Sequence, residues 1–102
     1  MITVRKPTEQ EAAQMQSLPT WGSPVDEFKW AYTDVETCLL IKGRVKVYYD
    51  ESIDFNKNDV EDIIEKATNV AEFGAGDLVT FAKGLQCVWV VTEAVEKYYK
   101  FG

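Results

Sequence analysis

Few residues of this chain could carry chemistry, and they lie in short segments that alternate with a period of two. Glu36 stands two positions before Cys38, and Cys87 stands two positions before Trp89. Side chains two residues apart share one face of a strand, so each pair points the same way if its segment is extended. Glu36 could act as a general acid or base, or anchor a polar group of a ligand. It is our best candidate for a catalytic residue.

The chain has two cysteines and no histidine. The commonest ligand for zinc, iron, copper and nickel is therefore missing, and so is histidine-based acid–base or nucleophilic catalysis. Cys38 and Cys87 could approach Glu36 and offer zinc two sulfurs and one oxygen. The simpler interpretation is that both cysteines are small buried apolar residues, as free cysteines usually are. We expect no metal and no cofactor.

The stretch from Gly74 to Val91 shows which elements must position these residues. It begins with turn chemistry in Gly-Ala-Gly-Asp, and a second turn follows at Lys83-Gly84. Between the turns, Val79 and Phe81 fall on one face of a short apolar segment. Short β-rich segments separated by such turns predict antiparallel all-β structure. By the same criteria we expect strands at 2–4, 27–32, 36–41, 44–49, 69–73, 78–81, 87–91 and 94–101, with turns at 42–43 and 92–93.

Three segments do not follow the strand pattern. Thr8 is a good helix N-cap, and the apolar spacing after it predicts a helix of about two turns that ends before Pro19. Residues 21–24 are expected to form a loop, with Trp21 at the loop or subunit surface. The acidic stretch 51–67 is expected to be a partly helical insertion capped by Asn58. This insertion is either a solvated face or a docking element for a partner.

Length and charge bound the remaining possibilities. One hundred and two residues, 46% of them hydrophobic, predict a single globular domain, 1–102. The net charge of −6 argues against binding to nucleic acid or to an anionic membrane surface. No apolar run approaches the ~20 residues of a membrane span. No apolar signal segment is present, so we expect a cytoplasmic protein, or an organellar one if a transit peptide has been removed.

Two spacings resemble the sequence motifs of the cupin superfamily. The first motif, G-x5-H-x-H-x3-4-E-x6-G, fits Glu36 and Gly43, and its histidine positions fall on Trp30 and Tyr32. The second, G-x5-P-x-G-x2-H-x3-N, fits Gly76 and Gly84 and places its histidine at Cys87. Ala82 and Val91 replace the proline and the asparagine. The segments E-T-C, G-D-L-V-T-F, G-L-x-C-x-W and K-x-Y-x-F are similar to those of small single-domain cupins of the ethanolamine-utilisation and ureidoglycine-aminohydrolase type.

The resemblance implies an all-β fold, namely a cupin-type double-stranded β-helix, or jelly-roll barrel, that is usually a homodimer. Three of the four family metal-ligand positions would then carry Trp, Tyr and Cys. Lys97 recurs in the family pattern and is a plausible ion-pair partner for Glu36, which would be costly to bury alone. Together with strand alternation, the resemblance gives a candidate ligand pocket formed by Trp30, Tyr32, Glu36, Cys38, Cys87, Trp89, Lys97 and Tyr99.

The resemblance does not fix an activity, because cupins have many functions. We expect a small-molecule-binding protein, with aromatic residues and one carboxylate that suit a sugar or a cationic amine. The alternatives are a protein–protein adaptor and a metal-independent enzyme acting on a sugar or on an amine or ureido substrate. We expect a homodimer in which the strand at 2–4 extends the sheet across a two-fold axis.

Overall fold

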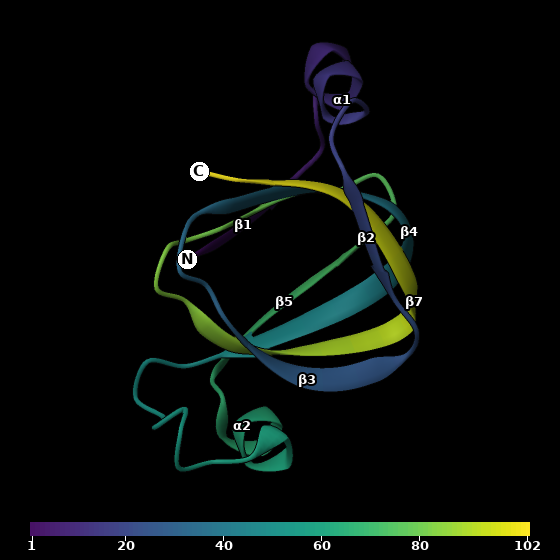
Figure 1. Ribbon diagram of the computed structural model, residues 1–102. Coiled ribbons are helices and arrows are strands. Elements are labelled where there is room, and N and C mark those ends of the chain that lie inside the picture. The colour runs from purple at the N-terminus through teal and green to yellow at the C-terminus, as the bar shows by residue number, and fades with distance from the viewer.

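The computed structural model describes residues 1–102, which form seven antiparallel strands and two short helices (Figure 1). This architecture confirms the predicted all-β fold with a short N-terminal helix and a partly helical insertion. The strands are β1 (Ile2–Arg5), β2 (Thr20–Ser23), β3 (Asp26–Ala31), β4 (Glu36–Tyr49), β5 (Asn69–Gly74), β6 (Leu78–Phe81) and β7 (Gln86–Phe101). The helices are α1 (Glu9–Met15) and α2 (Val60–Lys66).

The two long strands, β4 and β7, run through both halves of the sheet. The first half of β4 pairs with β6, and its second half pairs with β5. The first half of β7 pairs with β3, and its second half pairs with β2. Because β4 and β7 also pair with each other along their length, the sheet folds over on itself as a jelly-roll barrel. Figure 1 looks into this barrel, with α1 above it and α2 below it.

The predicted turns at 42–43 and 92–93 are wrong, because β4 and β7 are each continuous through these positions. Instead, both strands bend there, and their register shifts between Leu40 and Val45. Gly43 makes the bend possible. Its φ of +95° favours glycine, and a Cβ at this position would lie 2.4 Å from the Ala94 carbonyl oxygen. A glycine between two alternating segments indicates a β-bulge as well as a hairpin, and the sequence alone does not separate them.

Two smaller predictions also need correction. Residues 20–23 form β2, rather than a loop, because they pair with β7. Helix α2 is capped by Asp59, whose side chain accepts a hydrogen bond from the Asp62 N–H, and not by Asn58. The predicted cap of α1 is confirmed. Thr8 and Glu11 form a reciprocal capping box, with the Glu11 N–H donating to Thr8 Oγ1 at 3.1 Å.

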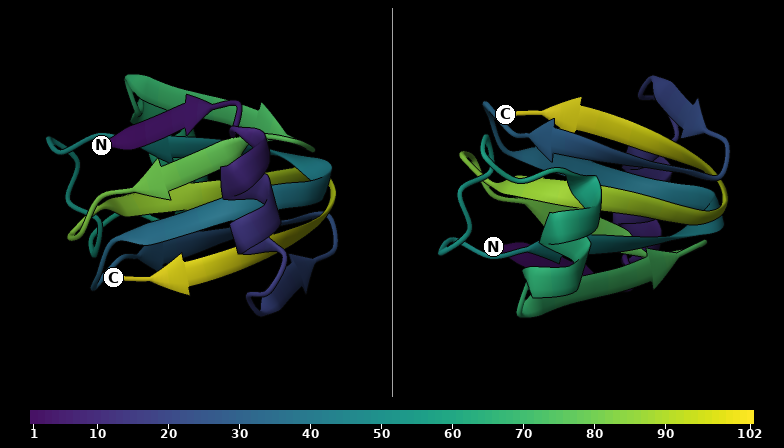
Figure 2. Two further views of the ribbon diagram at one scale, coloured as in Figure 1. Left: turned by 90° about the horizontal axis from the view of Figure 1, so that it is seen from above. Right: turned by 90° about the horizontal axis from the view of Figure 1, so that it is seen from below.

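The helices cover opposite outer sides of the barrel (Figure 2). Met15 of α1 packs with Leu39 and Leu78, which point away from the barrel interior. Helix α2 buries Ile63 and contacts β3, β4 and β7. Neither helix has the length and apolar character needed to cross a membrane.

The barrel interior holds the main core. Residues that alternate inward from both halves of the sheet form this cluster, and Val79 and Phe81 belong to it as their spacing predicts. The other buried members are Tyr32, Cys38, Leu40, Val45, Val47, Phe73, Leu85, Cys87, Trp89, Val91 and Val95. This core fills one part of the barrel and leaves a cavity in the other.

Candidate functional site

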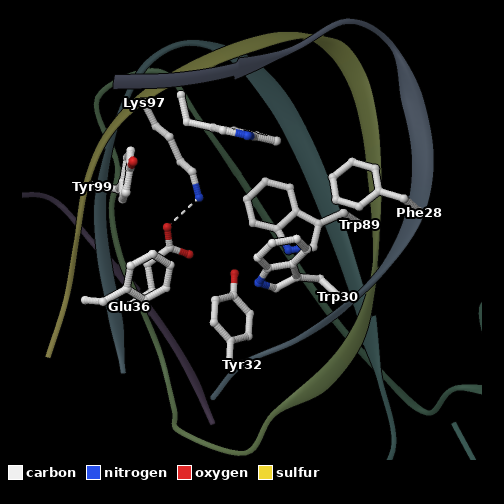
Figure 3. A pocket seen from close by; sticks show the side chains of 9 residues that line it. Phe28, Trp30, Tyr32, Glu36, Trp89, Lys97 and Tyr99 are labelled. Carbon is white, nitrogen blue, oxygen red and sulfur yellow. Dashed lines mark hydrogen bonds and ion pairs between the residues drawn. The ribbon is translucent and has the colours of Figure 1, made fainter. Parts of the chain in front are cut away.

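A cavity of about 190 Å³ lies inside the barrel and opens to solvent (Figure 3). Three of its wall residues are partly exposed, with exposed fractions of 38% for Trp21, 46% for Trp30 and 50% for Phe101. The wall is mainly aromatic, with one carboxylate and one amine. Its nine residues are Trp21, Phe28, Trp30, Tyr32, Glu36, Trp89, Lys97, Tyr99 and Phe101.

Six of the eight candidate pocket residues lie in this wall: Trp30, Tyr32, Glu36, Trp89, Lys97 and Tyr99. The other two, Cys38 and Cys87, do not, because both are packed in the core at 0% and 1% exposure. The predicted pocket does not include Trp21, Phe28 and Phe101, which also line the cavity. Phe28 shares the alternation of Trp30, and Phe101 shares that of Tyr99, so both could have been included. Trp21 falls in the segment predicted to be a loop, and its pairing with Lys97 in the sheet brings it inward.

Glu36 and Lys97 form a buried ion pair at the centre of the cavity wall. Lys97 Nζ donates to Glu36 Oε2 at 2.7 Å, and the two side chains are 6% and 3% exposed. Strand register sets this geometry. Lys97 lies opposite Leu40 on β4, and its side chain extends along the barrel to Glu36 at the start of that strand. The hypothesis that Lys97 pairs with Glu36 agrees with this contact. The negative charge of Glu36 is therefore balanced by a cation of the same chain.

Aromatic rings surround the ammonium group of Lys97. Its Nζ lies 4.7 Å from the ring centroid of Trp89, 5.1 Å from that of Trp21 and 5.9 Å from that of Phe81. A cation over an aromatic face is attracted by the ring quadrupole, and more strongly when it is desolvated. The rings also support one another, since Trp21 meets Trp89 edge-on at 6.0 Å and Phe28 stacks on Trp89 at 6.1 Å. The cavity thus contains a cation cage that is filled by a residue of the chain.

Tyr32 supplies a hydroxyl group on the side of Glu36 away from Lys97 (Figure 3). The residue follows β3 and is fixed by two backbone hydrogen bonds. Its N–H donates to the Leu85 carbonyl at 2.8 Å, and its carbonyl accepts from the Gly84 N–H at 2.8 Å. Burial raises the pKa of the Tyr32 phenol, and the neighbouring Glu36 carboxylate raises it further. Tyr32 is therefore a neutral hydrogen-bond donor at physiological pH.

The cysteines are poorly suited to bind a metal. Burial raises the pKa of the Cys38 and Cys87 thiols to about 12 in each case. The Cys87 thiol donates to the Trp30 carbonyl at 3.4 Å. No group of three or more His, Cys, Asp or Glu side chains is arranged to hold a metal ion. The zinc alternative built on Glu36, Cys38 and Cys87 therefore has no geometric support. The family metal-ligand positions, with Trp30 and Tyr32 among them, do not fit a metal either, because Lys97 already supplies the cation beside Glu36.

The indole N–H of Trp89 is a buried donor with no hydrogen-bond partner in the chain. The Cys87 sulfur lies beside this indole N–H, which lowers the pKa of the thiol against the larger, opposite effect of burial. Nearly all buried polar groups in proteins are paired, so such a donor calls for an explanation. The nitrogen is fully buried, so a molecule in the cavity would not reach it unless the ring moved.

Comparisons with known proteins agree with this fold. The family model of the EutQ-like cupin domain matches residues 10–99. A crystal structure of a DUF861 family protein, TM1112 from Thermotoga maritima, is 31% identical, with a TM-score of 0.80 and 100% of both chains covered. The Clostridium difficile EutQ protein is 14% identical, with a TM-score of 0.59, over 96% of this chain and 64% of that one. A Salmonella typhimurium protein described as a possible ethanolamine utilization protein Q is 16% identical, with a TM-score of 0.57, over 96% and 66%. No curated protein matches the chain.

Proposed function

Because the chain belongs to the EutQ-like cupin domain family, we propose that its barrel binds a small neutral molecule in the cavity beside Glu36 and Lys97. The volume of about 190 Å³ is below the roughly 300–1,000 Å³ of pockets for drug-sized ligands. A ligand of a few carbon atoms or a single small ring fits this size. A compact sugar or polyol has the required chemistry, with C–H faces for the aromatic walls and hydroxyls for the polar groups.

The observation that carries this proposal is the ion pair itself. With Lys97 Nζ 2.7 Å from Glu36, a cationic amine would have to displace a tethered ammonium from its carboxylate and its aromatic cage. An anionic ligand would add a second negative charge next to Glu36 in a poorly solvated space. A neutral ligand avoids both costs. Its hydroxyl could pair with Tyr32 or with the second oxygen of Glu36.

Tryptophan fluorescence tests the proposal directly, because all three tryptophans of the chain line the cavity. We expect D-ribose and glycerol to change the emission in a saturable way, and ethanolamine at neutral pH to leave it unchanged. Trp30→Ala should weaken binding, because this side chain forms part of the entrance. Val70→Ala, which alters another exposed apolar residue on β5, should not. Saturation by ethanolamine alone, or no response to any neutral probe, would refute the proposal.

We also propose that the protein is a homodimer joined through β1. This strand pairs only with β6, so its other edge is free, and Thr3 to Arg5 are exposed. A free strand edge can pair with a second copy. Sedimentation velocity should show a dimer, and Val4→Lys, which places a charge on the edge, should favour the monomer. A monomer for the unaltered protein at all concentrations would contradict this. Cytoplasmic location stays a prediction.

A further inference from the structure

Lys97 is the only buried lysine of the chain, and its amine lies in the wall of the cavity. A lysine amine in an apolar pocket is a typical nucleophile toward carbonyl compounds, provided that a nearby group can take its proton. Glu36 lies at 2.7 Å and can do so.

We infer that Lys97 forms a Schiff base with a small aldehyde or ketone that enters the cavity. This inference rests on the proposed function, since the cavity must first bind the neutral carbonyl compound. Three groups are required, namely an amine, a proton acceptor for it and a donor to the carbonyl oxygen. Lys97, Glu36 and Tyr32 supply them in that order, and all three lie in the same wall.

The step balances without any further reagent. Glu36 takes a proton from the Lys97 ammonium, and the free amine pair attacks the carbonyl carbon to form a C–N bond. The C=O π pair moves to the oxygen, which accepts a hydrogen bond from Tyr32 and is then protonated by the Glu36 carboxylic acid. A second proton passes from nitrogen to the hydroxyl group through Glu36, and water leaves as the C=N bond forms. The net change is ammonium plus carbonyl giving protonated imine plus water.

A positive charge lies beside the Glu36 carboxylate both before and after the reaction. The protonated imine keeps one positive charge beside Glu36, so the buried carboxylate is not left alone at the end of the reaction. The rings of Trp89 and Trp21 contact a cation in both states. The site therefore holds the adduct without separating or creating net charge.

Reductive trapping tests the inference. The protein is incubated with glycolaldehyde and cyanoborohydride, and the modified lysines are mapped by peptide mass spectrometry. We expect adduct on Lys97 to form faster than on the exposed Lys83 and Lys100, and this preference should vanish in urea. Lys97→Arg keeps the positive charge and should give no adduct in the cavity. Glu36→Gln should slow trapping by about a hundredfold, the loss expected for one acid–base group.

Binding without reaction is measured separately with ethylene glycol, an unreactive analogue of the probe, by tryptophan fluorescence. If ethylene glycol binds and Lys97 is not trapped preferentially, the Schiff-base inference is wrong and the proposed function stands. If ethylene glycol, glycerol and D-ribose all fail to bind and Lys97 is not trapped, both are refuted. The comparison of Lys97 with Lys83 and Lys100 in the unaltered protein tests the Schiff-base inference even if a variant fails to fold.

Discussion

Removing the amine of Lys97 leaves a buried carboxylate with no cation. Breaking a buried ion pair from one side typically costs ~3–5 kcal/mol, whereas replacing both partners with apolar groups is often neutral. We therefore predict that Lys97→Met lowers the free energy of unfolding by about 4 kcal/mol. The double variant Glu36→Leu with Lys97→Met should recover most of this loss.

Urea denaturation of the single and double variants measures both effects. Salt provides an independent check, because a buried pair is screened much less than an exposed one. The loss caused by Lys97→Met should be nearly the same at low and at high ionic strength. A loss below about 1 kcal/mol, the range of surface pairs, would show that the pair is solvated.

At the residue scale, the resemblance to cupins and strand alternation together predict six of the nine residues that line the cavity. The resemblance implies that Trp30, Trp89 and Lys97 share one enclosure, and alternation gives the inward direction within each strand. Alternation does not say how deep a side chain lies, however. Cys38 and Cys87 have the expected inward direction, yet they fall within the filled part of the barrel, where exposure is 0% and 1%. Depth depends on packing between distant strands, which local sequence does not encode.

At the element scale, the bend in β4 depends on Gly43. An alanine there would need a positive φ, and its Cβ would lie 2.4 Å from the Ala94 oxygen and 2.6 Å from the Val95 Cα. We predict that Gly43→Ala costs ~3 kcal/mol or more, which combines backbone strain with displacement of β7. Gly84 is the matched control. It also has a positive φ, of +85°, but open space around its Cβ position.

Gly84→Ala should therefore cost only the backbone term, about 1 kcal/mol. Thermal or urea unfolding of the two variants gives the comparison. Equal losses at Gly43 and Gly84 would mean that the contact with β7 does not constrain the bend. The same contact explains why the turns at 42–43 and 92–93 were predicted wrongly. The bend places Gly43 against Ala94 and Val95 of β7, and this contact joins residues far apart in the sequence.

At the scale of the whole molecule, the two free cysteines report on opening of the barrel. Cys38 is in β4 and Cys87 is in β7, and both belong to one core cluster. Thiolate is the reactive form, and pKa values of about 12 leave little of it at neutral pH. We predict that iodoacetamide labels neither cysteine in the native protein at neutral pH, and that mild destabilisation labels both at one common rate.

Mass spectrometry of peptides containing each cysteine measures the two rates, and the urea-unfolded protein gives the fully reactive control. Markedly faster labelling of Cys87 than of Cys38 would contradict a single cooperative core. It would instead indicate that β7, which contains Cys87, opens independently of β4. The sequence predicted the all-β architecture and two free cysteines, but not that they share one core.

Because the cation beside Glu36 is the amine of Lys97, the charge balance of the site does not depend on the uptake of a metal ion. A cation that belongs to the polypeptide cannot be chelated, exchanged for a competing ion or lost during purification. Its stoichiometry is set when the chain is translated, and its loading does not vary with the mineral status of the cell. The counter-charge in this barrel therefore depends on one codon, the one for Lys97, and a change there cannot be rescued from the growth medium.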